Sequence, residues 1–343
     1  GKLSSVVNFI SDQSISDTSH ISVNAGIFIS GVAARFSPDK KTTVNLSGRF
    51  GTTSILEKIV HKNISEFPFY NFYDINLGTS RILNNKNSVS LTLFVNKDYL
   101  SKNTYKTLKT ETGDTTALAD VAKSGWADIL AGFTWNFQPK DNLKVETRIS
   151  YQYFNSNSNH ESLDPVHDQS STNRAESTIQ EFGISNQWEA DRVNHKLNFG
   201  FCSYFRNIDP FMSTSVLLKG SPIYDVPDPI SKEKPILQLE FSPYFEDQFN
   251  ITKNTTFRPG IRFLTLIGSK KVFILPEPRL YVSHKISDKV SVMGSWVGTT
   301  QDIQLISSSN IMSCSDLWIP AGGEIKPAYS NMEEIGFFFN DGM

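Results

Sequence analysis

The chain has 343 residues, of which 20% are charged, and its formal net charge is −2 at pH 7. This near balance excludes the strongly basic surface that nucleic-acid-binding proteins present to phosphates. Aromatic residues make up 12% of the chain, which favours strands over helices, and there is no run of about 18 apolar residues that would span a membrane as a helix.

Apolar and polar residues alternate with a period of two along most of the chain, which predicts β-strands. The clearest segments are residues 43–50, 88–96, 127–137 and 143–153. Most are long for soluble strands and match the length that crosses a bilayer at a tilt. The apolar face, expected to contact lipid, carries Val44, Leu46, Val89, Leu91, Leu93, Ile129, Phe133, Val145 and Ile149. The polar face, expected to line a lumen, carries Arg49, Ser90, Asp128, Glu146 and Arg148.

The connections between these segments alternate between short and long. The short ones, rich in Pro, Asp, Asn and Lys, are residues 38–41, 84–87, 139–142, 191–194, 251–254 and 287–289. The long polar ones are residues 51–69, 101–125, 155–177, 208–234 and 300–326. Tight turns on one side and long loops on the other are typical of outer-membrane barrels. We therefore predict an all-β fold, an antiparallel transmembrane β-barrel wall of about fourteen strands.

A soluble β-sandwich is the alternative that the alternation leaves open, because its strands also alternate apolar and polar residues. Charged residues at inward positions argue against it, since a dry sandwich core would have to bury them at high cost. A wet lumen accepts them. These residues are Glu146, Arg148, Arg206, Glu240 and Arg262.

Residues 276–339 carry a series of short motifs in a fixed order. They are Glu277-Pro278-Arg279, then Gln301, then Asp316-Leu317-Trp318 with Pro320, then Lys326-Pro327. This order closely resembles that of TonB-dependent outer-membrane receptors of the Bacteroidetes type. Residues 242–263 and 194–205 resemble the preceding hairpins of that family, and residues 1–10 resemble the end of its plug domain.

The resemblance implies a domain organisation and a function. Residues 1–16 would end the plug, and residues 17–343 would form part of a barrel of about twenty-two strands in the bacterial outer membrane. Such a receptor binds a scarce nutrient (a metal chelate, a cofactor or an oligosaccharide) and imports it with energy from TonB. The implied partners are TonB through the plug region, outer-membrane lipid, the extracellular ligand and a surface lipoprotein, with no resident cofactor or metal.

We read the chain as a fragment or a processed chain, because Gly1 and Lys2 begin it without a signal peptide. The first barrel strand, near residues 19–27, and the last, near residues 328–339, are expected to keep one unpaired edge each. Two alternatives remain open: a passive fourteen-stranded porin-like channel, and a non-transporting barrel that serves as a scaffold for surface proteins. No GxSxG, HExxH, Walker or GxGxxG motif supports an enzyme.

Candidate ligand-binding residues are few. The connection at residues 155–177 contains His160, Asp164, His167 and Asp168. These side chains could bind a metal chelate, but the two histidines are seven residues apart, so a solvated polar loop is the favoured interpretation. Trp318 could contact a substrate, although packing of its loop against the barrel rim is favoured.

Aromatic residues suggest girdles at the two rims of the barrel. An extracellular girdle would contain Tyr70, Phe72, Tyr73, Tyr151 and Tyr153. A periplasmic one would contain Trp135 and Phe137.

Overall fold

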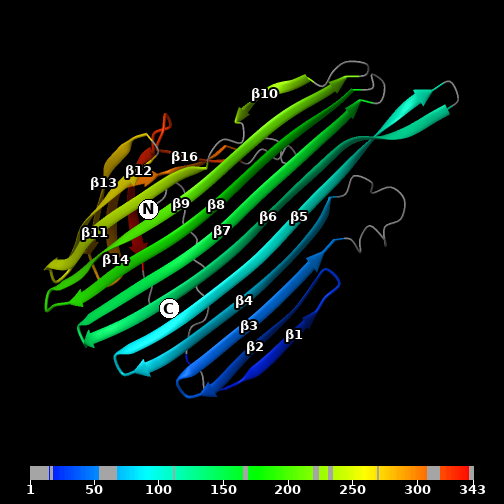
Figure 1. The fold of residues 1–343 in the computed structure, drawn as a ribbon. Coiled ribbons are helices and arrows are strands. Elements are labelled where there is room, and N and C mark those ends of the chain that lie inside the picture. The colour runs from blue at the N-terminus through cyan, green and yellow to red at the C-terminus, as the bar shows by residue number, and fades with distance from the viewer. Residues whose placement is uncertain are drawn as a thin grey trace.

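The computed structural model describes residues 15, 18–53, 68–110, 113–164, 169–218, 224–230, 235–268, 270–306 and 317–339. In these residues the chain is built of strands and turns, and no helix is long and apolar enough to cross a membrane. Fourteen strands form one antiparallel sheet in which nearly every strand pairs with its neighbours in sequence. Figure 1 shows this sheet as a curved wall of long, tilted strands.

The fourteen strands follow one another in the order β1-β2-β3-β4-β5-β6-β7-β8-β9-β11-β12-β13-β14-β17. Their bounds are β1 His20–Ala25, β2 Ile29–Asp39, β3 Thr42–Thr52, β4 Phe69–Asn84, β5 Asn87–Thr110, β6 Gly113–Lys140, β7 Leu143–Asp164, β8 Gln169–Asp191, β9 His195–Leu218, β11 Ile236–Thr252, β12 Thr255–Ile267, β13 Val272–Lys285, β14 Val290–Gln301 and β17 Ala328–Phe339. β10 (Tyr224–Ile230) adds to β9, and β15 (Ile303–Ile306) pairs with β16 (Leu317–Pro320) in a separate hairpin. The predicted number and order of antiparallel strands are confirmed.

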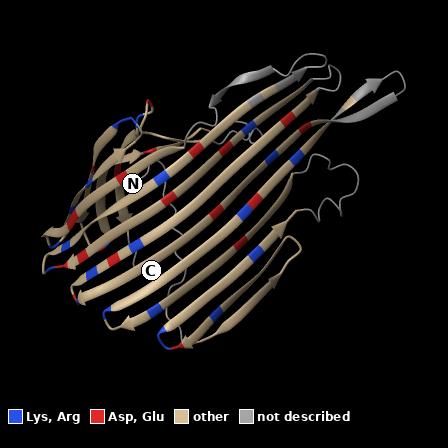
Figure 2. Cartoon of the chain, in the orientation of Figure 1, with Lys and Arg blue, Asp and Glu red and all other residues tan. Residues whose placement is uncertain are grey.

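The short connections lie at one end of the sheet, where charged residues gather in Figure 2. The long connections differ from the prediction. The predicted loop at residues 101–125 is mostly strand, because β5 and β6 continue to Thr110 and from Gly113. The predicted loop at 155–177 is likewise mostly taken up by β7 and β8. In these stretches both faces carry polar residues, so the sequence shows no alternation of apolar and polar residues. Backbone pairing nevertheless continues beyond the amphipathic part of each strand.

Backbone pairing sorts the side chains onto two faces, as predicted. We call the apolar side of the sheet the outer face. One row of register partners on this face runs from β3 to β9 and consists of Leu46, Leu77, Leu93, Ala131, Tyr151, Phe182 and Phe205. Its large side chains are exposed. A row on the opposite, inner face consists of small buried hydroxyl residues, namely Thr43, Ser80, Ser90 and Thr134. A shift of one residue would exchange the two faces, so the predicted register is confirmed.

Val145 lies on the outer face like Ile149, but it is only 7% exposed. Its register partners on the two neighbouring strands, Phe137 and Trp188, both carry large rings on the same face. The ring of Trp135 stacks on that of Phe137 with centroids 5.7 Å apart on the same face, as predicted for an aromatic girdle.

Two members of the other predicted girdle were assigned to the wrong face. Tyr70 and Phe72 have the same parity as Asp74 on β4, and therefore lie on the inner face. The Tyr70 hydroxyl donates a hydrogen bond to Asp98, which is 8% exposed. Tyr73 lies on the outer face and is exposed. The sequence signal that could have decided this is the charge of Asp74, since the apolar side of a membrane strand excludes a carboxylate.

Among the described residues the sheet does not close into a ring. β1 pairs with β2 alone, and β17 pairs with β14 alone, so each presents one edge of unpaired backbone groups. Large apolar side chains on β17 are strongly exposed, with Ile335 at 78% and Phe337 at 75%. The expectation that these strands do not pair with each other is confirmed.

Candidate functional site

Between β14 and β17, the described residues 302–306 and 317–322 fold back onto the inner face of the wall, and we call these residues the folded-back segment. Its hairpin of β15 and β16 contacts β8 and β9. The Trp318 backbone N–H donates a hydrogen bond of 3.0 Å to the Ser177 hydroxyl on β8, and the Trp318 ring meets Phe154 of β7 edge-on at 6.4 Å. Ala321 packs on Leu264 and Leu266 of β12.

A close approach of two glycines fixes the far end of this segment. Gly322 has φ = +125°, a conformation that residues with a side chain rarely adopt. A Cβ added at Gly322 would lie 2.8 Å from the Gly268 Cα, so backbone meets backbone without room for a methyl group. The inward fold therefore depends on glycine at both positions.

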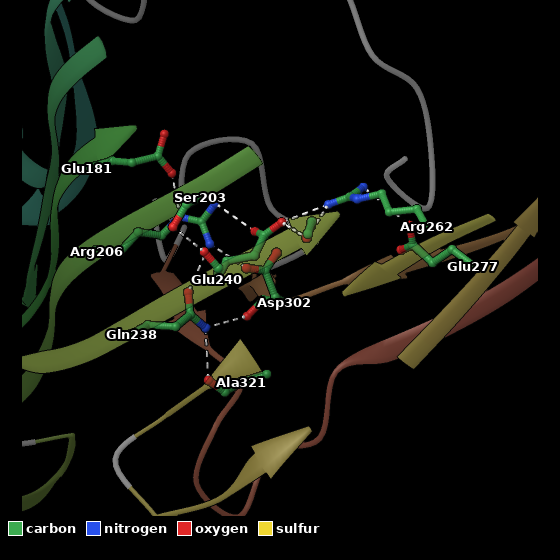
Figure 3. A network of polar contacts seen from close by, with 10 residues as sticks. Glu181, Ser203, Arg206, Gln238, Glu240, Arg262, Glu277, Asp302 and Ala321 are labelled. Carbon is green, nitrogen blue, oxygen red and sulfur yellow. Dashed lines mark hydrogen bonds and ion pairs between the residues drawn. The ribbon is translucent and has the colours of Figure 1, made fainter. Parts of the chain in front are cut away.

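A network of buried charges, which we call the inner-wall network, ties the segment to the sheet (Figure 3). It consists of Glu181, Arg206, Gln238, Glu240, Arg262, Glu277 and Asp302. Arg206 of β9 lies at its centre, and its side chain is only 5% exposed. The Arg206 guanidinium donates to Glu181 and Glu240 on the wall and to Asp302 at the start of the folded-back segment.

The other members complete the attachment. The Gln238 amide donates to the Ala321 carbonyl at 3.0 Å, so one side chain of β11 holds the end of the segment while Arg206 holds its beginning. Arg262 contacts Glu240 at 2.7 Å and Glu277 at 3.3 Å. Removing one partner of such a buried set is strongly destabilising, because it leaves an uncompensated charge away from water.

The charged side chains of the inner-wall network have a structural role. Asp302 and Glu277 are fully buried, and both arginines are engaged by carboxylates. Glu277, from the Glu-Pro-Arg motif, also accepts a 2.8 Å hydrogen bond from the Thr300 backbone N–H. The network holds the segment inside the wall and leaves no cation of its own for a ligand.

A second group on the inner face is more open. Trp126 of β6 is 38% exposed, and Asp128 follows on the same face of that strand. The Gln152 amide of β7 donates to the Asp128 carboxylate at 2.8 Å. Phe154 is the register partner of Asp128 and contacts the Trp318 ring. We call these five residues the Trp126 cluster.

The predicted ligand residues occupy different places. His160 lies within β7, with its Nε2 atom 3.7 Å from Asp120 of β6. Asp164 ends β7, but its side chain is not described, and His167 and Asp168 lie outside the described residues. No group of three or more potential metal ligands occurs in the part of the chain that the structure describes. Trp318 packs its segment against the inner wall.

The sequence predicts Arg206, Glu240 and Arg262 as inward charges, and the structure brings all three together. It had not marked Gln238, Asp302 or Trp126. Strand alternation carries a signal for Gln238 and Trp126, since both fall on the polar face. The contact with Asp302 depends on the inward fold of its segment and has no local sequence signal.

No protein-family profile matches the chain, and no curated protein matches it. Among solved structures, it resembles BauA, the ferric preacinetobactin receptor of Acinetobacter baumannii, with a TM-score of 0.62, 11% identity, 94% of this chain covered and 52% of that chain. The described residues have the fold of part of the wall of an outer-membrane receptor barrel. This receptor-barrel fold is shared by PiuA, a siderophore receptor of Acinetobacter baumannii, with a TM-score of 0.62, 10% identity and 92% and 54% coverage.

The copper transporter OprC is similar too, with a TM-score of 0.59, 10% identity and 94% and 50% coverage. BauA and PiuA are TonB-dependent outer-membrane receptors. The chain spans about half the length of these structures, and at this level of identity the likeness concerns the fold.

Proposed function

We propose that this chain forms part of the barrel wall of a TonB-dependent receptor in the bacterial outer membrane, which binds a scarce nutrient and imports it. The observation that carries the proposal is the two-faced wall of fourteen antiparallel strands, with short turns at one end. An apolar outer face suits lipid, and an inner face rich in charges suits an aqueous lumen. No enzymatic step is part of this role.

The inner-wall network supports a receptor over a simple pore. A passive channel needs an open lumen, whereas here Asp302 is held against the inner wall by Arg206, and Ala321 is held there by Gln238. Residues held inside the wall in this way would narrow the lumen of a completed barrel. This proposal includes the Bacteroidetes type of receptor, TonB as the energy source and a surface lipoprotein as partner.

The unpaired edges of β1 and β17 bear on the porin-like alternative. A fourteen-stranded porin would need these edges to pair with each other, because backbone groups cannot stay unpaired in lipid. We propose instead that further strands pair with both edges and complete a wider barrel. The non-transporting scaffold differs from the receptor only in lacking import, so import is the property to test.

The test is genetic. A strain lacking the gene is compared with a strain lacking TonB, and with the double mutant, across media in which one nutrient at a time limits growth. We expect the gene deletion to impair growth on one limiting nutrient, the TonB deletion to impair it equally, and the double mutant to be no worse. A defect that persists independently of TonB would support a passive channel, and no defect on any nutrient would support the scaffold.

A further inference from the structure

Each short turn that the structure describes at one end of the sheet carries a lysine or an arginine (Figure 2). These turns join β2 to β3, β4 to β5, β6 to β7, β8 to β9, β11 to β12 and β13 to β14. One exposed cation from each turn defines what we call the turn-end rim: Lys41, Lys86, Lys140, Arg192, Lys253 and Lys289. Successive turns are two strands apart, about 10 Å, so the electric fields of neighbouring rim cations overlap.

The short turns are more cationic than the chain as a whole. Residues 38–41, 84–87, 139–142, 191–194, 251–254 and 287–289 contain seven Lys and Arg but four Asp and Glu, whereas the whole chain has 33 and 35. Among the described residues, lysine ion pairs occur at Lys271 and Lys285, and no rim cation forms one. The rim therefore presents positive charge that the described carboxylates do not neutralise.

The rim lysines are not needed to build their turns. In three turns, the side chain two residues before the rim lysine accepts a hydrogen bond from the backbone N–H of that lysine. The acceptors are Asp39, Asn84 and Ser287, at 2.7, 2.9 and 3.3 Å. Such bonds fix a turn through its polar residue. The ammonium groups of these lysines are left for a partner outside the sheet.

Aromatic rings on the outer face indicate how far the rim lies from the lipid chains. Three ring pairs lie close to the turns, with centroids 5.7, 6.0 and 5.6 Å apart: Trp135 and Phe137, Trp188 and Phe199, and Phe249 and Phe257. Such rings lie at the boundary between lipid chains and headgroups.

The rim cations of β6, β8 and β11 follow Phe137, Trp188 and Phe249 by three or four residues. That is about 10–14 Å along a strand, or about 7–10 Å along the membrane normal for a tilted strand. The headgroup layer is about 5–8 Å deep on each side of a bilayer. A long cationic side chain can also reach back towards it. The rim is thus at the level of the lipid phosphates.

We propose that the turn-end rim binds the headgroups of anionic phospholipids, such as phosphatidylglycerol, in the membrane leaflet at the short-turn end. Phosphatidylglycerol carries a net negative charge, whereas phosphatidylcholine is neutral overall, so the rim favours the former. The inference rests on the proposed placement of this wall in the outer membrane, and it names the lipid class that the turns select.

The test uses the complete protein, reconstituted in phosphatidylcholine vesicles with a trace of spin-labelled lipid. Electron paramagnetic resonance measures the fraction of labelled lipid that the protein surface immobilises, for phosphatidylglycerol and for phosphatidylcholine. One cation near a membrane surface favours an anionic lipid about five-fold. The measurement averages over all lipid around the protein, so we expect a preference for phosphatidylglycerol of about two-fold at low salt. The preference should disappear in about 1 M NaCl, which screens exposed charges.

A variant of the rim tests whether these turns carry the preference. Lys41→Gln, Lys86→Gln, Lys253→Gln and Lys289→Gln together should bring the ratio close to one, and arginine at the same four positions should keep it. The charge-matched control changes four lysines towards the other end of the sheet and should leave the ratio unchanged. It combines Lys102→Gln, Lys270→Gln, Lys271→Gln and Lys326→Gln.

A preference that the rim variant loses and the control keeps would support the inference. It is refuted if the parent shows no preference for phosphatidylglycerol, if the glutamine variant of the rim retains it, or if the control loses it equally. Absence of a lipid preference together with rim-dependent sedimentation on purified peptidoglycan would instead assign the rim to the cell wall. The measurement needs neither a substrate nor TonB, so TonB-dependent growth can stand while this inference fails.

Discussion

Replacement of Arg206 by methionine should release the folded-back segment and destabilise the barrel. Methionine is close to arginine in length, so the change removes the charge without opening a large cavity. It removes the Arg206 guanidinium that two buried carboxylates contact, Asp302 at 0% and Glu240 at 1% side-chain exposure. Glu240 keeps Arg262, and Glu181 is exposed enough to gain water, so Asp302 should account for most of the loss. We expect a cost of about 3–5 kcal/mol.

The free energy of unfolding can be measured by urea titration of the protein in lipid vesicles. Release of the segment can be measured by maleimide labelling of Ala321→Cys, which should react slowly in the parent because Ala321 is 1% exposed. Arg206→Met should speed this labelling. Adding Asp302→Asn should recover part of the lost stability, since the buried charge is then gone.

Arg148→Ala is the control for a less critical arginine on the same face. Its ion pair with Glu146 is 3.1 Å long but largely exposed, so the loss should be about 1 kcal/mol or less. If Arg206→Met costs no more than Arg148→Ala, and labelling of the Ala321→Cys thiol stays slow, the inner-wall network does not hold the segment and the reasoning is refuted.

Leu91→Arg on the outer face should lower the free energy of unfolding in lipid vesicles by about 2–4 kcal/mol. Thr92→Arg should lower it little, because the inner-face partners Gly78 and Gly132 leave open space. Equal losses for the two variants in urea titrations would contradict the assignment of faces. Gly322→Ala should lower stability by about 1–3 kcal/mol, because of its positive φ and the contact with Gly268. Gly323→Ala, with open space around its Cβ, should be neutral, and the same titration distinguishes the two.

Much of the fold could be predicted from the sequence because a strand in a membrane wall obeys one simple rule. Residues such as Leu46 and Leu91 alternate with polar ones, and that period fixes both the strand and its face. Tyr70 and Phe72 show the limit of the rule: aromatic residues suit both the lipid side and the lumen, so residue type alone assigned them wrongly. The parity of Asp74 carried the decisive information.

The functional site could be predicted only in part. Arg206 and Arg262 are recognisable as inward charges, since alternation places them on the polar face. Their attachment to Asp302 joins residues about one hundred positions apart through the inward fold of a connecting segment, and no local pattern encodes such a contact. Trp126 was missed because it falls in a stretch that was expected to be at the edge of a loop, where β6 in fact continues.

The most direct test of the central claim is the backbone pairing of β1 and β17 in an experimental structure of the complete protein in lipid nanodiscs. The account predicts that the free edge of each strand forms an antiparallel ladder with a strand outside the fourteen of this sheet, as in a wider receptor barrel. A continuous ladder of hydrogen bonds joining His20–Ala25 directly to Ala328–Phe339 would contradict it and would make the chain a closed fourteen-stranded channel.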